Sequence, residues 1–229
     1  MIRRDYILRM IEEFAQVLAR IRSLKRSQRW GEASAALDSE FKRLIGDGGQ
    51  AVARLSETEL LSRLVQDGPT HVVRDKTLML TTLLKEAGDV AAAQDWADES
   101  AECYLKALHL LLDVLARGEV FEWPEFLPKV EMLKEALQET PLPPRTHAML
   151  MQHHERTGEF AKAENALFTM LDAEPDNGAI VEFGVGFYKR MLEQSNTALA
   201  DGGLPRAEAE EGLNEFLQRS KRSHTQSAQ

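Results

Sequence analysis

Hydrophobic residues recur at three- and four-residue spacing along most of the chain. The clearest case is near the N-terminus, where the apolar positions are Ile7, Met10, Ile11, Phe14, Val17, Leu18, Ile21 and Leu24. This spacing places apolar side chains on one face of a long amphipathic helix. Alternation with a period of two, which indicates strands, is missing throughout. The pattern therefore predicts an all-α protein.

Glycine, proline and capping residues divide this pattern into separate helices. The expected helices cover about 7–24, 31–45, 56–66, 72–87, 90–116, 124–138, 145–156, 160–173, 179–195 and a last one that begins at Pro205. The short helix after Ser56 begins with a Ser-x-x-Glu capping box and ends at Asp67-Gly68-Pro69. The tail 220–229 has no apolar period, and we expect it to be disordered.

The stretch from Arg145 to Asn177 carries the most information about the fold. Gly158 stands at a turn between two helical segments, Ala163 stands where the helices would touch, and Pro175 ends the second helix. These positions resemble a tetratricopeptide repeat (TPR), whose unit of about 34 residues is two antiparallel helices around a tight turn. The resemblance implies antiparallel helix hairpins stacked as a TPR-like right-handed solenoid.

Weaker copies of the repeat occur upstream. Gly88 is interpreted as the turn glycine of one copy, and Trp30, Ala33 and Leu37 are similar to the second-helix positions of another. We therefore expect a helical hairpin plus a short helix over 1–66, TPR-like repeats over 69–219, and the tail 220–229.

A second resemblance concerns the N-terminal part. Asp5-Tyr6-Ile7 with Arg9, followed by Trp30-Gly31-Glu32-Ala33 and Leu60-Leu61, is similar to an uncharacterised bacterial family that opens with Asp-Tyr-Ile-x-Arg. The resemblance implies a bacterial, cytoplasmic protein and supplies no catalytic residues.

Charge is distributed unevenly along the chain. The net charge is −9, yet eight basic and three acidic residues give the first 30 positions +5 and leave −14 for the remainder. The acidic body argues against DNA binding, which needs a basic face. The basic first helix leaves contact with an anionic surface, membrane or RNA, open as an alternative.

Candidate chemistry is sparse. His153 and His154 are adjacent and point in different directions from a helix, and His147 is too far from His154 for the two to share a metal ion. Gly184 and Gly186 follow no strand, so we interpret them as sites of close helix packing. Cys103 is the single cysteine, which excludes an intramolecular disulfide and a cysteine-based zinc site. We expect no metal, no cofactor and no catalytic residues.

The leading hypothesis is therefore a non-catalytic protein-interaction scaffold in the cytoplasm, without a transmembrane segment, whose partner is an unknown protein or peptide. First helices of TPR hairpins form the binding face, and the candidate residues on that face are Leu78, Thr82, Lys85, Arg145, Gln152, Glu155 and Arg156. The alternatives are the anionic-surface binder and a small-molecule-binding helical sensor.

The apolar stripe of the first helix is longer than one partner helix can cover. Its cover could be the short helix after Ser56, a second copy of the protein in a homo-oligomer, or a foreign partner.

Overall fold

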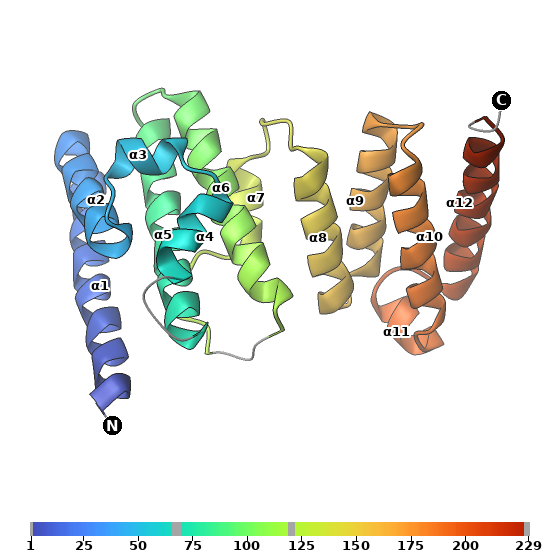
Figure 1. Ribbon diagram of the computed structural model, residues 1–229, viewed down its shortest axis with the longest axis horizontal. Helices are drawn as coiled ribbons and strands as arrows, with labels where there is room; N and C mark the ends of the chain where they lie inside the picture. Colours follow the sequence, from blue (N-terminus) through green and yellow to red (C-terminus); the bar gives the residue numbers. More distant parts are fainter. Residues whose placement is uncertain (1, 66–69, 119–121, 227–229) are drawn as a thin grey trace. The chain divides into compact units, whose positions relative to one another are not determined.

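The computed structural model describes residues 2–65, 70–118 and 122–226, and within these ranges the secondary structure is helical without any strand (Figure 1). The helices are α1 Ile2–Arg26, α2 Trp30–Ile45, α3 Gly49–Arg54, α4 Glu57–Val65, α5 Thr70–Ala92, α6 Ala97–Ala116, α7 Val130–Ala136, α8 Pro144–Thr157, α9 Phe160–Ala173, α10 Gly178–Leu192, α11 Asn196–Asp201 and α12 Arg206–Gln226. The all-α prediction is confirmed.

The chain divides into two compact units, Met1–Pro141 and Leu142–Gln229. This division differs from the one expected near residues 66–69. Helices α1, α2 and α4 all pack on α5, so the N-terminal hairpin belongs to the same unit as α5 and α6. Because α5 is surrounded in this way, its residues from Thr77 to Leu84 are all buried.

The turn between α5 and α6 lies later than expected. Gly88 is inside α5, and the chain turns at 93–96, where Asp95 takes a left-handed φ of 60°. A Cβ atom at position 88 would lie 2.8 Å from Cε1 of Tyr104 in α6. Gly88 is therefore a point of close approach between two helices, and its interpretation as a turn glycine is wrong.

Local signals place several other helix ends. Gly46 ends α2 at φ 82°. The capping box at α4 forms, since Ser56 N donates to Glu59 Oε2 at 2.8 Å and Glu59 N donates to Ser56 Oγ at 3.3 Å. The expected end of this helix at 67–69 lies outside the described residues.

Two predicted boundaries need correction. The helix expected over 124–138 is reduced to α7, because Pro128 favours an extended residue before it and the chain over 122–129 is a loop. At the C-terminus, disorder was expected over 220–229, but α12 continues to Gln226; positions 227–229 lie outside the described residues. Lysine, arginine and glutamine there are good helix formers that extend an existing helix at little cost.

From Met10 to Leu24, most of the apolar stripe of α1 is covered within its own unit, and Ile11 and Val17 are half-buried. The exposed fractions of Met10, Phe14, Leu18, Ile21 and Leu24 are all 8% or less. The cover comes from α2, from α5 and from Phe126, whose ring meets the ring of Phe14 edge-on with centroids 5.0 Å apart. Helix α4, one of the three covers considered from the sequence, packs mainly on α5 instead.

The second unit has its own core, formed by α8, α9, α10 and α12. Two glycines permit close packing there: a Cβ at Gly184 would overlap the ring of Phe216, and one at Gly212 would overlap the ring of Tyr188. The interpretation of Gly184 as a site of close helix packing is thereby confirmed. For Gly186 it is wrong, because among the described residues a Cβ there would approach only the Arg190 side chain of the same helix, at 3.3 Å. The rings of Phe216 and Tyr188 are fully buried.

Candidate binding groove

The structure rejects part of the binding face expected from the sequence. Leu78 and Thr82 are 2% and 0% exposed, and the Thr82 hydroxyl donates to the Leu78 carbonyl at 3.0 Å. They cannot contact a partner, because α5 is packed on several sides. Lys85, one turn further along the same helix, has a side chain that is 19% exposed.

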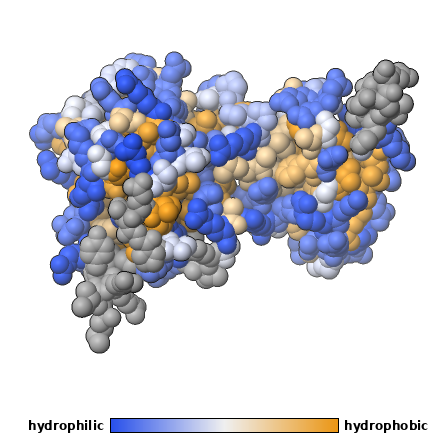
Figure 2. All heavy atoms as spheres, in the orientation of Figure 1, coloured by the Kyte–Doolittle hydropathy of each residue, from blue (hydrophilic) through white to orange (hydrophobic). Residues whose placement is uncertain are grey.

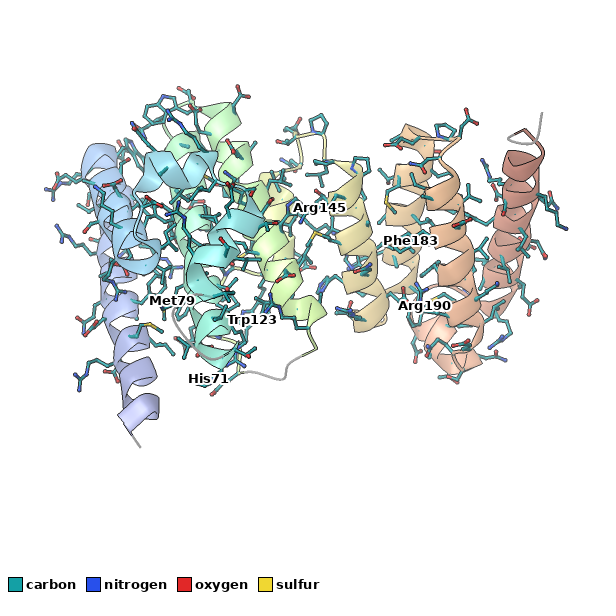
Figure 3. The ribbon with its side chains drawn as sticks, viewed as in Figure 1. His71, Met79, Trp123, Arg145, Phe183 and Arg190 are labelled. Atoms are coloured by element: carbon teal, nitrogen blue, oxygen red, sulfur yellow. The ribbon has the colours of Figure 1, made fainter. Side chains whose placement is uncertain are left out.

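The remaining candidates lie on α8 in the second unit. Arg145, which is labelled in Figure 3, lies on α8 and is exposed. Gln152 and Arg156 of the same helix are also exposed, and the proposed role of all three in binding stays a prediction. Glu155 forms a two-point ion pair with Arg190 of α10, with Nε–Oε1 at 2.6 Å and NH2–Oε2 at 2.8 Å. Glu155 therefore fixes α8 against α10.

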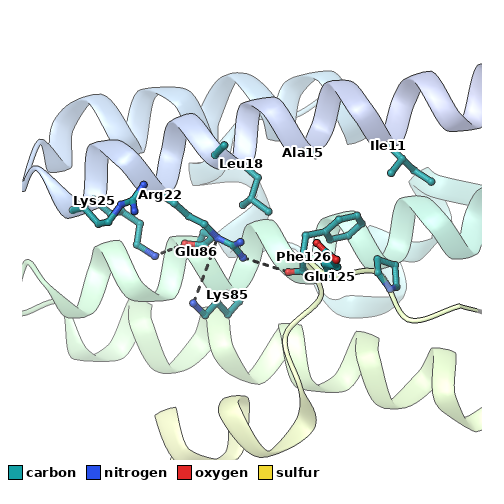
Figure 4. Close-up of a pocket in the computed structure, with 12 residues that line it drawn as sticks. Ile11, Ala15, Leu18, Arg22, Lys25, Lys85, Glu86, Glu125 and Phe126 are labelled. Carbon is teal, nitrogen blue, oxygen red and sulfur yellow. Dashed lines mark hydrogen bonds and ion pairs between the residues drawn. The ribbon is translucent and has the colours of Figure 1, made fainter.

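Lys85 lines a groove in the first unit that sequence reasoning missed. Helices α1 and α5 and the loop residues 124–126 enclose a cavity of about 800 Å3 (Figure 4). One end is apolar and contains Ile11, Ala15 and Phe126, whereas the other end contains Arg22, Lys25 and Lys85. We call this cavity the α1–α5 groove.

A buried carboxylate organises the basic end. The side chain of Glu86 is 1% exposed. It accepts a hydrogen bond from Arg22 Nε at 2.9 Å and another from Lys25, and Lys85 Nζ lies 3.7 Å from its Oε1. A buried carboxylate is stable only when it is paired and hydrogen-bonded, so these cations hold Glu86 in place and it holds them.

Asp89, one turn after Lys85, completes the cluster. It accepts hydrogen bonds from Lys25, from Lys85 at 2.8 Å and from the Tyr104 hydroxyl at 2.8 Å. Burial raises the pKa of Asp89, but the hydrogen bonds from Lys25 and Lys85 outweigh it, so the pKa lies below its ordinary value. Burial and the neighbouring Asp89 charge raise the pKa of Tyr104, which keeps its hydroxyl a donor.

The groove carries an excess of positive charge. Three cations, Arg22, Lys25 and Lys85, meet only the two carboxylates of Glu86 and Asp89. Arg26 also lines the groove and has no ion-pair partner within the described residues. On the opposite wall stands one exposed acid, Glu125. The arrangement favours an anionic ligand that also has apolar groups.

Only the basic part of this site, the positive charge of the first helix, could be predicted from the sequence. The positive charge of the first helix was evident, but the ion pairs between α1 and α5 span 61 and 64 residues. No local pattern indicates such a pairing. A useful signal was the acidic Glu86 within an apolar helical run, since a buried acid requires cations from elsewhere in the fold.

A second cavity lies between α2, α3, α5 and α6, with a volume of about 600 Å3. Leu37, Phe41 and Leu84 belong to its apolar lining, and Trp96, which is 52% exposed, also lines it. Cys103 lines the same cavity, and burial raises the pKa of its thiol to about 11. This thiol is therefore a weak nucleophile near neutral pH.

Other candidate chemistry resolves into structural contacts. His154 is buried and its Nδ1 lies 2.8 Å from Oε2 of Glu159, as expected for a packing role. In the part of the chain that the structure describes, no group of three or more potential ligands is placed to hold a metal ion. None of the described helices is sufficiently long and apolar to span a bilayer.

The comparisons with known proteins give one family, whose function is unknown. No curated protein and no solved structure matches the chain. Residues 1–221, nearly the whole chain, match the model of a family of unknown function, DUF6483. The chain therefore belongs to the DUF6483 family.

Proposed function

We propose that this chain is a non-catalytic protein-interaction scaffold whose helix hairpins are TPR-like and stack as a right-handed solenoid. The α8–α9 hairpin is the observation that carries the proposal. Gly158 turns the chain at φ 77°, Phe160 is 6% exposed beside it, and Ala163 is 0% exposed on α9, which packs on α8. These are the features of the repeat that the sequence resembles.

Two further helix pairs support a repeated design. The α5–α6 pair is in close contact at Gly88, and the α10–α12 pair is in close contact at Gly184 and Gly212. Both depart from a regular repeat, the first by its late turn and the second by the inserted α11. Stacked hairpins of this kind offer extended surfaces to a partner.

A protein partner fits the groove better than an anionic surface does. Arg22 and Lys25, two of the basic residues of α1, are paired with Glu86 and Asp89. Their positive ends therefore face a recess, whereas binding to a lipid bilayer uses basic side chains on an open helix face.

Affinity capture with the full-length chain tests the proposal. Photo-crosslinkable residues at Gln152 on the α8 face and at Arg26 in the groove, with exposed Glu12 as the control position, should crosslink at least one protein in near-equal amount to the chain. The captured protein should be absent or scarce with the Glu12 probe. Two outcomes would contradict the scaffold. In one, no protein is captured above the level seen with an unrelated helical protein. In the other, all three probe positions capture the same proteins.

The small-molecule alternative has one observation in its favour, the cavity of about 600 Å3 lined by Trp96 and Cys103. Ligand pockets have this size and apolar lining. Because Cys103 is the single cysteine, its alkylation rate reports the occupancy of this cavity. A metabolite extract that slows alkylation at least about tenfold, and shifts Trp96 fluorescence, would support a sensor; an unchanged rate would exclude one for that extract.

A further inference from the structure

We propose that the α1–α5 groove binds a short peptide segment of a partner protein in which acidic residues adjoin apolar ones. The inference rests on the proposed scaffold function and names the chemistry of the partner. The observation behind it is that the α1–α5 groove, of about 800 Å3, has an apolar end next to a basic end.

The apolar end presents a fixed surface. Phe126 is held edge-on against the buried Phe14, with ring centroids 5.0 Å apart, and Arg22 NH2 donates to the Phe126 carbonyl at 3.4 Å. Ala15 is exposed beside it, and its small side chain leaves room for a larger one from a ligand. A leucine or aromatic side chain of a peptide would remove this apolar surface from water.

The basic end is organised before a ligand arrives. Lys25 bridges Glu86 and Asp89, and Lys85 Nζ lies 2.8 Å from Asp89, so both ammonium groups are held by carboxylates of α5. Little side-chain entropy remains to be lost when they meet an anion. Arg26 adds a guanidinium that has no partner in the described chain and can take a carboxylate in two-point geometry.

The positive charge extends beyond the groove along α1. Positions 14 to 26 contain four basic residues, Arg20, Arg22, Lys25 and Arg26, and no acidic one. Arg29, which follows the helix, is paired with Glu32. Among the described residues that line the groove, Glu86 and Glu125 are the only acids. An acidic segment is therefore attracted to this end of α1, whereas a basic one is repelled. The apolar end then selects among acidic segments.

Selection from a phage library of random dodecapeptides on the immobilised full-length chain tests the ligand class without a presumed sequence. Peptides that survive washing should be enriched in aspartate or glutamate next to leucine, isoleucine, phenylalanine or tryptophan. Synthetic copies should bind more weakly at 300 than at 50 mM salt, by about threefold or more, because the contacts are charge-assisted. Selected peptides without acidic enrichment would overturn the proposal.

Variants on one helix locate the site. Arg26→Glu reverses a groove cation and Ala15→Glu places a charge at the apolar end, while Arg20→Glu makes the same charge change as Arg26→Glu at an exposed residue that does not line the groove. The first two should weaken peptide binding at least about tenfold and the control at most about threefold. Circular dichroism verifies that each variant is folded. Equal losses in Arg26→Glu and Arg20→Glu would show a diffuse charge effect and overturn the groove.

Two further measurements separate the possible failures. Vesicles that contain phosphatidylglycerol, tested with the same variants, should compete poorly for the peptide; displacement of the peptide by vesicles would assign the groove to lipid and overturn the proposal. A protein captured by the wild type that still binds Arg26→Glu and Ala15→Glu would reject the groove but retain the scaffold. Absence of any captured protein would reject the scaffold itself.

Discussion

Three threonines in α5 are buried without leaving a polar atom unpaired. The hydroxyls of Thr77, Thr81 and Thr82 donate to the carbonyls of Val73, Thr77 and Leu78, each four residues earlier, at 2.7 to 3.0 Å. This bond within the helix removes most of the cost of burying a hydroxyl. It explains why a helix that reads as half polar can lie at the centre of a unit.

Close approach at Gly88 gives a first prediction. In Gly88→Ala the new methyl group meets the Tyr104 ring, which is anchored by its hydrogen bond to Asp89. We expect a loss of about 1–3 kcal/mol in the free energy of unfolding, measured by urea denaturation. Gly31→Ala is the control, because position 31 has open space in α2; it should gain up to about 1 kcal/mol. Equal effects at both positions would contradict a close contact at Gly88.

The crossing of α8 and α9 gives a second prediction. Ala163 is 0% exposed, so Ala163→Leu should overpack the crossing and lower the free energy of unfolding by about 1–3 kcal/mol. Ala173→Leu, at the exposed last residue of α9, provides the control and should change it by less than about 0.5 kcal/mol. A loss below about 0.5 kcal/mol at Ala163 would remove the main support for a TPR-like hairpin.

At the scale of helices, α1 is attached to the first unit by two different means. Its apolar stripe packs on α2, α5 and Phe126, and its basic end pairs with Glu86 and Asp89 of α5. We infer that the apolar contacts contribute most of the stability between the helices and that the ion pairs fix their register.

The stripe itself can be tested with Phe14→Glu. Because Phe14 is 0% exposed against Phe126, the buried charge should unfold the first unit or cost at least about 3 kcal/mol. Gln16→Glu, at an exposed position of the same helix, should leave stability within about 0.5 kcal/mol of the wild type. If Phe14→Glu remained helical and eluted from a size-exclusion column as a smaller species, the stripe would be a seam between copies in a homo-oligomer.

The ion pairs predict a specific pH dependence. The folded pKa of Asp89 is lowered, so its carboxylate adds stability above the unfolded pKa, and this stability is lost as the pH falls through the folded pKa. Asp89→Asn should cost about 1–3 kcal/mol at pH 7. The difference from the wild type should persist down to the unfolded pKa, about 3.9, and shrink as the pH falls from there through the folded pKa, below which protonated Asp89 resembles asparagine. Asp98→Asn, at an exposed site, should show no such convergence.

The features that could be predicted from the sequence also differ from one helix to another. Helix ends with a local chemical cause, such as Gly46, the Ser56–Glu59 capping box and Pro144, were predictable because the cause lies within a few residues. The prediction that Leu78 and Thr82 belong to an exposed binding face was wrong. Periodicity assigns one buried face to a helix, whereas α5 packs on several neighbours. The α1–α5 groove depends on pairs some 60 residues apart. Glu86 in an apolar run signals that cations must meet it, but a single sequence does not show which cations they are.

At the scale of the molecule, the two units have separate cores. Met151, Leu167, Phe187 and Phe216 belong to one cluster contributed by residues after Leu142. A fragment of residues 142–229 should therefore be helical by circular dichroism and unfold cooperatively in urea by itself. The same fragment with Ala163→Leu should unfold at lower urea. A fragment that is a random coil would show that this core requires the first unit.

The long separation between α1 and Phe126 has a consequence during synthesis. Arg22 and its acceptor on Phe126 are 104 residues apart in sequence. A ribosome adds roughly 5–20 residues per second, so α1 leaves the exit tunnel roughly 5–20 s before the loop that covers its stripe leaves it. Helix α2 can shield part of the stripe early. Phe14 waits for the loop to emerge, whereas Arg22 waits for Glu86 only until α5 emerges. The nascent chain thus carries an uncovered apolar edge for seconds. Chaperone binding or aggregation would compete with folding during the interval between the emergence of α1 and that of the loop at 124–126.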